Sequence, residues 1–194
     1  MGRKRIRDIR NEELIEATIV AAHRYGYHSV TMTEIARVAG ASAASISYYF
    51  GSKNGLMEAT MLHLLRKLQA LLLKSFRTAN SPEERLYAIL NANFDDSLFT
   101  VEQCSIWMQF WASAPYSPEL SRLHRINRGR VRSHFRAELG QLFPPAEAEL
   151  ARHALQSYMD GVWLEAAQSS KPLDAKSARR SAKGVADLLL QNRR

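Results

Sequence analysis

The stretch IARVAGASAASISYYFGSK, residues 35–53, combines small side chains with hydroxyl groups and a cation. Alanine and serine fill most outward positions of the second helix that its spacing predicts. Side chains this small let a helix approach base edges in the DNA major groove, while hydroxyls and an ammonium at the groove wall bind phosphates. The predicted DNA contacts are Thr31, Thr33, Ala43, Ala44, Ser45, Ser47, Tyr48, Tyr49 and Lys53.

Two short helices joined at Gly40 would position these side chains. Ile35 and Ile46 fall on inward faces, Ala36 is small where the helices cross, and Ser42 can cap the second helix. Gly40 supplies a turn conformation that other residues enter only with strain. This spacing fits a helix-turn-helix, although helical hairpins with a central glycine also occur in ordinary bundles.

Positive charge is concentrated in two parts of the 194-residue chain. Lys and Arg number 27 against 19 Asp and Glu, for a net charge of +8. A basic surface of this kind indicates a polyanionic partner, with a solvated basic face as the alternative. The two concentrations are Arg3, Lys4, Arg5, Arg7 and Arg10 at the start, and Arg122, Arg125, Arg128, Arg130, Arg132 and Arg136.

Apolar residues recur at three- and four-residue spacing along almost the whole chain, which predicts an all-α protein. Capping residues and prolines mark the helix starts. The expected capping boxes are Thr31 with Glu34, Ser81 with Glu84, and Thr100 with Gln103. About nine helices are predicted, over residues 11–25, 32–39, 43–49, 54–78, 82–94, 101–114, 118–142, 146–169 and 174–191.

The first three of these helices are short and the others long. This contrast predicts an N-terminal helix-turn-helix domain, residues 1–53, and a larger effector-binding and dimerisation domain, residues 54–194. No run approaches the roughly 20 apolar residues that span a bilayer, and the N-terminus lacks the apolar stretch of a secretory signal. We therefore expect a cytoplasmic protein without membrane contact.

Motifs for catalysis and metal binding are scarce. The six histidines lack the spacing of a zinc site. The segment GSKNG is not a full phosphate-binding loop, and no GxSxG motif occurs. The sequence therefore predicts no metal, no cofactor and no enzymatic activity.

The segment TMTEIARVAGASAASISYYFGSKNGLM resembles the N-terminal signature of the tetracycline-repressor (TetR) family. The family commonly has a tyrosine where this chain has Ser47, and Tyr48 is expected to take over part of its role. The matching positions are Thr31, Ile35, Ala36, Ala39, Gly40, Ser42, Ile46, Tyr49, Phe50, Lys53 and Leu56.

The rest of the chain resembles a narrower group, the BetI-type repressors. This resemblance implies control of choline-to-glycine-betaine genes with choline or a related quaternary ammonium compound as effector. A TetR-type repressor with a different hydrophobic or cationic effector is the alternative. The matching segments are KNGLMEATM (53–61), NFDDS (93–97), FWAS (110–113), DGVWLEAA (160–167) and KPLD (171–174).

The ingredients of a site for such a cation are present. A quaternary ammonium cannot donate hydrogen bonds, so proteins hold it against aromatic faces, often near a carboxylate. We expect a pocket among the fifth, sixth and eighth helices, lined by Trp107, Trp111 and Trp163, with Asp160 or Asp95 as the counter-charge. The competing interpretation is that these aromatic residues are simply core.

One helix-turn-helix buries too little surface for tight operator binding. We therefore expect a homodimer whose two heads bind successive major grooves of double-stranded DNA about 34 Å apart. Small residues in the last two predicted helices, such as Ala154, Gly161, Ala166 and Ala167, would permit close packing of the subunits. Two other functions stay open at this point: a basic helical adaptor and a small-molecule enzyme.

Overall fold

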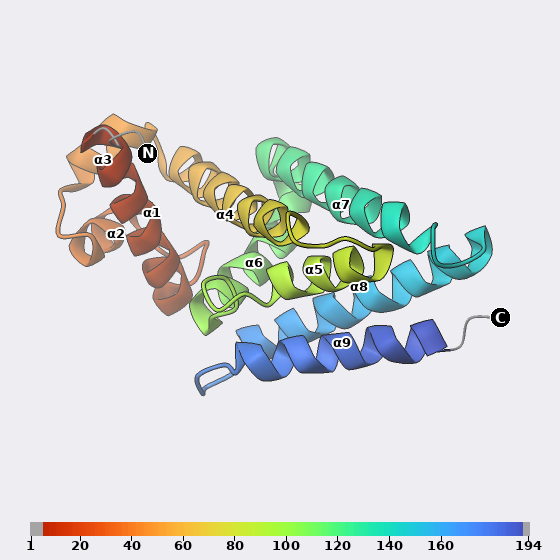
Figure 1. Ribbon diagram of the computed structural model, residues 1–194. Coiled ribbons are helices and arrows are strands. Elements are labelled where there is room, and N and C mark those ends of the chain that lie inside the picture. The colour runs from red at the N-terminus through yellow and green to blue at the C-terminus, as the bar shows by residue number, and fades with distance from the viewer. Residues whose placement is uncertain (1–5, 192–194) are drawn as a thin grey trace.

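The computed structural model describes residues 6–191 and consists of helices connected by short turns (Figure 1). The described range contains nine α-helices and no strand, which confirms the all-α prediction. Arg3, Lys4 and Arg5 of the first basic concentration lie outside the described residues, as does the side chain of Arg7. The elements are α1 (Ile6–Tyr25), α2 (Met32–Val38), α3 (Ala43–Phe50), α4 (Lys53–Phe76), α5 (Pro82–Asn93), α6 (Val101–Ser113), the 3₁₀-helix η1 (Ala114–Tyr116), α7 (Pro118–Leu139), α8 (Pro145–Ala167) and α9 (Ala175–Gln191).

The largest difference from the predicted boundaries is at the start of α1. This helix begins at Ile6 rather than at residue 11. Its first turns are polar and give no apolar stripe, but Arg10 Nη1 bonds Glu13 Oε2 at 2.8 Å one turn later. Such side-chain pairs support a solvated helical end that apolar periodicity does not predict.

The turn between α2 and α3 has the predicted geometry. Gly40 has a φ of +58°, and the amide of Ala41 donates to the carbonyl of Ala36 at 2.9 Å, closing the end of α2. Thr31 and Glu34 form a complete capping box at the start of α2. At the start of α3, Ser42 Oγ accepts from the amide of Ser45 at 3.0 Å.

The other two expected capping boxes are only half formed. Ser81 accepts from the amide of Glu84 and Thr100 from that of Gln103, as predicted. The Glu84 carboxylate instead accepts from the amide one residue before the cap. Gln103 donates to the carbonyl of Ser97, in the turn before α6. The prediction that the Glu84 and Gln103 side chains bond the backbone of the cap residue is therefore wrong, because the preceding turn offers each a better-placed partner.

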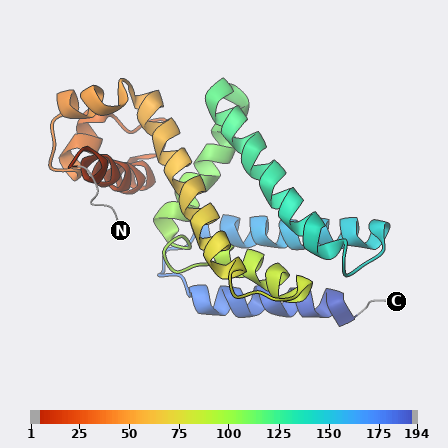
Figure 2. The same cartoon turned by 45° about the horizontal axis from the view of Figure 1, so that its top comes forward.

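Helices α1–α3 gather at one end of the molecule, and the long α4 runs from them into the larger helical body (Figures 1 and 2). Helices α8 and α9 run antiparallel side by side along one edge of that body. Within the described range, no helix is long and apolar enough to cross a bilayer.

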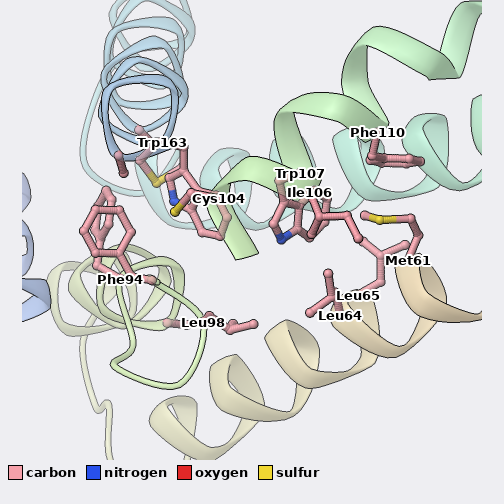
Figure 3. Packing of buried hydrophobic residues seen from close by; sticks show 14 of the residues in the cluster. Met61, Leu64, Leu65, Phe94, Leu98, Cys104, Ile106, Trp107, Phe110 and Trp163 are labelled. Atoms are coloured by element: carbon pink, nitrogen blue, oxygen red, sulfur yellow. The ribbon is translucent and has the colours of Figure 1, made fainter. Parts of the chain in front are cut away.

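The core of the body forms around α6. Figure 3 shows Trp107 of α6 and Trp163 of α8 in the same interior as Met61 and Leu64 of α4, with Phe94 alongside. Each of these five side chains is at most 6% exposed. Burial of this order contributes about 1.5–3 kcal/mol per large apolar side chain, so α6 is held from several sides at once.

The junction between α3 and α4 depends on Gly55. A Cβ atom at this position would lie 2.3 Å from the carbonyl oxygen of Phe50. The amide of Gly55 also donates to Ser52 Oγ, the N-cap of α4, at 3.1 Å. Close approach of backbone to backbone therefore fixes how α3 meets α4.

We expect Gly55→Ala to lower the free energy of unfolding by about 1–3 kcal/mol, because the added methyl has no room. Gly129→Ala on α7 is the matched control, since a Cβ there meets no atom within 4 Å. It should stabilise the helix by up to about 1 kcal/mol. Denaturant unfolding of both variants measures this, and equal stabilities would contradict it.

Candidate functional site

The outward face of α3 is as bare as its sequence suggests. Ile46 is fully buried and anchors the helix, while Ala44, Ser47 and Tyr48 are exposed. Tyr48 is 80% exposed and stands beside Tyr49, whose ring centroid is 5.4 Å away at a near-perpendicular angle. The exposed face of α3 thus carries only small side chains and is bordered by the hydroxyls of Tyr48 and Tyr49.

The other residues of the expected DNA face are placed as follows. Thr33 is exposed, whereas Ala43 and Ser45 are half-buried. The hydroxyl of Thr31 accepts from the amide of Glu34 at 3.2 Å and donates to its carboxylate at 2.9 Å. Thr31 therefore caps α2, the helix that precedes α3.

Lys53 makes a contact that its sequence position does not indicate. Its Nζ donates to the carbonyl of His28 at 2.6 Å and is half-buried. Burial lowers the pKa of this ammonium, against an opposing effect of Glu34. The side chain ties the start of α4 to the turn between α1 and α2, in addition to any contact with phosphate.

A partly open pocket lies in the helical body, with a volume of about 440 Å³ that includes the open space at its mouth. Four of the five residues expected at the effector site, Trp107, Trp111, Asp160 and Trp163, line it. The Trp107 ring centroid is 6.4 Å from that of Trp111 and 5.9 Å from that of Trp163, in edge-to-face arrangements. The structure thus brings three indoles and one carboxylate from two helices to one cavity.

The fifth expected residue, Asp95, is not among the residues that line this pocket. Its carboxylate accepts from the amide of Ser97 at 2.9 Å and from the hydroxyl at 2.6 Å. Burial raises the pKa of Asp95, but these hydrogen bonds and the nearby Arg179 and Lys67 together lower it. Asp95 therefore shapes the turn between α5 and α6.

Several pocket residues were missed from the sequence. Asn93 of α5 and Asn127 and Arg128 of α7 line the cavity with Leu68, Val131 and Met159. Asn127 carried a usable signal, because asparagine inside a helix is unfavourable unless a local polar partner rewards it. Arg128 was assigned to the basic face of residues 122–136.

Arg128 neutralises the carboxylate of the pocket. Its Nη1 lies 2.7 Å from Asp160 Oδ2, and the two side chains are 40% and 31% exposed. A pair this accessible to water contributes at most about 1 kcal/mol. The pair therefore holds α7 to α8 weakly enough to be exchanged.

The indole nitrogens of the pocket are left without acceptors. Nε1 of Trp107, Trp111 and Trp163 is buried and has no hydrogen-bond partner among the described residues. Buried donors are nearly always paired, so each such group needs an explanation. An acceptor group that reached one of these nitrogens would satisfy it.

The helix that carries two of the indoles also holds the N-terminal helices. Gln109 of α6 accepts from the amide of Tyr27, and the Ser113 hydroxyl lies 3.0 Å from His28 Nε2. Arg122 of α7 pairs with Glu58 of α4 at 3.2 Å. Helices α6 and α7 therefore connect the pocket to the reading head, the N-terminal helices α1–α3 that we expect to bind DNA.

Comparison with known proteins agrees with this arrangement. The model for bacterial regulatory proteins of the tetR family matches residues 14–60, and the model for the C-terminal part of BetI-type transcriptional repressors matches residues 82–191. The chain is 38% identical to the HTH-type transcriptional regulator BetI of Burkholderia thailandensis over 189 residues, 97% of each chain. The chain belongs to the TetR family, in its BetI-type group.

Other relatives of this BetI-type repressor cover it equally well. BetI of Ectopseudomonas mendocina is 39% identical over 188 residues, 96% of each chain. A regulator from Pseudomonas aeruginosa has a TM-score of 0.78 at 25% identity, covering 95% of this chain and 92% of that one. A regulator from Saccharomonospora viridis, crystallised in complex with choline, has a TM-score of 0.75 at 20% identity, covering 93% and 96%. The family and the BetI relatives identify a DNA-binding regulator rather than an enzyme.

We expect Tyr48→Phe and Lys53→Met to weaken operator binding in different ways. Loss of the Tyr48 hydroxyl should lower affinity several-fold and leave thermal stability unchanged, because the side chain is exposed. Loss of the Lys53 ammonium should lower both, because the His28 carbonyl loses its donor. Operator titration and thermal unfolding measure the two effects. An unchanged melting temperature for Lys53→Met, or an unchanged affinity for Tyr48→Phe, would contradict this assignment.

Proposed function

We propose that this BetI-type repressor controls genes of choline and glycine betaine metabolism and responds to choline or a related quaternary ammonium compound. The main support is the pocket in which Trp107, Trp111 and Trp163 surround space beside the Asp160 carboxylate. Indole faces attract a quaternary ammonium by about 0.5–2 kcal/mol each. The choline bound to a regulator of the same fold supports the same ligand class. A regulator that binds the chromosome of a bacterium acts in its cytoplasm.

The unpartnered indole nitrogens extend this proposal. Cation–π attraction uses the face of a ring and leaves the N–H of its edge free to donate. Nε1 of Trp107, Trp111 or Trp163 can therefore bond the hydroxyl of choline while a neighbouring ring receives the trimethylammonium group. An effector with both groups would satisfy more of the pocket than a simple cation.

Binding must also act on the Arg128–Asp160 pair. The effector's ammonium would face a carboxylate that Arg128 already neutralises at 2.7 Å. For Asp160 to serve as its counter-charge, Arg128 must move aside, which removes one of the polar contacts between α7 and α8 and leaves the Arg136–Glu149 pair in place. Because the Arg128–Asp160 pair is weak, the effector's ammonium can replace Arg128 at little cost in free energy. Binding of the cation would thereby be linked to movement of α7.

Helices α6 and α7 would carry this movement to DNA. The first holds the turn after α1 through Gln109 and Ser113, and the second holds α4 through Arg122 and Glu58. A shift in either changes the orientation of the reading head on its subunit. Release of DNA requires that the effector prefer the conformation whose heads are wrongly spaced, since equal affinity for both would shift nothing.

The same function needs two heads, and we place the dimer contact on α8 and α9. Leu150, Gly161 and Leu164 of α8 are exposed, as are Gly184 and Leu188 on the neighbouring α9. Of the small residues expected there, Gly161 fits this role because it is exposed. Ala166 does not, since it is 5% exposed and packs within its own subunit. TetR-type regulators act as dimers, and this stripe would allow two helix pairs to approach closely.

The effector proposal is tested by titration with choline and tetramethylammonium. Choline should raise the melting temperature of the wild-type protein and reduce operator retention. Asp160→Asn should lower the affinity for both cations about tenfold or more. Trp111→Phe should lower the affinity for choline more than that for tetramethylammonium, because only choline can accept a hydrogen bond from the lost N–H.

Tyr116→Ala provides the aromatic control, since Tyr116 is 87% exposed on η1 and does not line the pocket. It should leave both affinities unchanged. If neither cation stabilises the wild-type protein, the choline assignment fails while the membership in the repressor family stands.

The dimer contact is tested by a pair of charge substitutions. Leu164→Asp should dissociate the protein into monomers and weaken operator binding, because a carboxylate would be buried against its own copy. Leu73→Asp on α4 is the matched control, since Leu73 is 51% exposed and Leu164 is 49% exposed. Sedimentation velocity measures the state, and dimers in both variants would exclude this face.

A further inference from the structure

A second, partly open cavity lies between α7 and α8 and is strongly basic; its volume is about 410 Å³ including the open space at its mouth. It shares Arg128 and Asp160 with the tryptophan-lined pocket, and Arg132, Arg152 and His153 line the rest with two polar residues. Arginine keeps its charge at all ordinary pH values. Three guanidinium groups therefore face one carboxylate, and the lining carries an excess of positive charge.

Arg152, one of the residues that line this cavity, has an unused donor. Its side chain is 4% exposed, its Nη1 donates to Gln156 Oε1 at 2.6 Å, and its Nη2 donates to Glu149 Oε1 at 2.7 Å. Its Nε is buried and has no hydrogen-bond partner among the described residues. A buried N–H of a charged group that lacks an acceptor costs more than a neutral one, so this nitrogen points to an absent acceptor.

The nearest acid is already occupied. Glu149 also accepts from Arg136 Nε at 3.1 Å, and His153 Nε2 lies 3.5 Å from it. The hydrogen bonds from Arg152 and Arg136 lower the pKa of Glu149 to about 2. Glu149 does not line the cavity, which leaves Asp160 as the carboxylate that faces the three arginines there.

We propose that this cavity binds a small oxyanion group, a phosphate or a carboxylate, through the guanidinium groups of Arg152, Arg132 and Arg128. Guanidinium groups match the planar or tetrahedral oxygens of such groups with several parallel hydrogen bonds. Arg132 is exposed at the mouth and Arg152 is buried at the wall, so an incoming anion meets one cation first and the other in the interior.

The shared residues connect this site to the effector pocket, a step that rests on the proposed function. An oxyanion on Arg128 competes with Asp160 for the same guanidinium. Asp160 then becomes available to the quaternary ammonium on the other side of the pair. By linkage, the anion must raise the affinity for the cation by the same factor by which the cation raises the affinity for the anion.

The anion site is tested first without any cation, on the full-length protein. Inorganic phosphate, titrated at constant ionic strength against chloride, should raise the melting temperature in a saturable manner. Arg132→Gln should weaken this binding at least fivefold. Arg125→Gln, an exposed arginine of the same helix outside the cavity, should leave it unchanged.

Arg152→Gln gives the stronger effect if it folds, and Arg132→Gln decides the matter if it does not. The proposal is overturned if phosphate does not stabilise the protein, as when a carboxylate of the partner subunit fills the cavity. It is equally overturned if the Arg132→Gln and Arg125→Gln variants bind phosphate as the wild type does.

A second titration distinguishes a separate anion from the anionic end of the effector. If the anion is separate, phosphate should raise the affinity for choline at least threefold, and Arg132→Gln should abolish this increase. If one molecule supplies both groups, glycine betaine or phosphocholine should bind more tightly than choline, and Arg132→Gln should remove the advantage. Phosphate binding without any cation binding would leave the anion site standing and overturn the effector proposal.

Discussion

The position of α6 is the constraint on which the rest of this repressor depends. Within 13 residues the helix presents Trp107 and Trp111 to the pocket and Gln109 and Ser113 to the turn between α1 and α2. A helix is stiff over this length, so it cannot adjust to a ligand at one face without moving the other. Under the proposed function, α6 is therefore the element that would carry a movement at the pocket to helices α1–α3.

The polar groups around the pocket are arranged for exchange rather than for maximum stability. The Arg128–Asp160 pair is part-exposed and weak, and the indole nitrogens beside it have no acceptor. The pair adds little to the stability of the free protein, and the unpaired buried donors reduce it. Under the proposed function, these features would give an effector interactions that the protein alone does not make, and the switch requires that it make them better in one conformation than in the other.

The reading head obtains its precision from backbone contacts because its surface has so few large side chains. Ile46 is the fully buried residue of α3, Gly40 turns the chain into that helix, and Gly55 lets α4 approach its end within contact distance. The exposed face of α3 then takes no part in folding. Its residues can vary with the operator at little cost to stability, as expected of a surface that reads base edges.

Local features of this fold follow from the sequence alone. The Thr31 and Ser42 caps, the left-handed turn at Gly40 and the helical periods depend on residues a few positions apart, and the structure has them as predicted. Contacts over long separations were decided only by the tertiary structure, because one chain position permits several partners until the helices pack. Lys53 is turned to the His28 carbonyl, Arg128 to the pocket carboxylate and Asp95 away from it. Residue type and spacing therefore predicted that three indoles and an acid share one pocket, as they do, whereas packing decided which cation stands beside them.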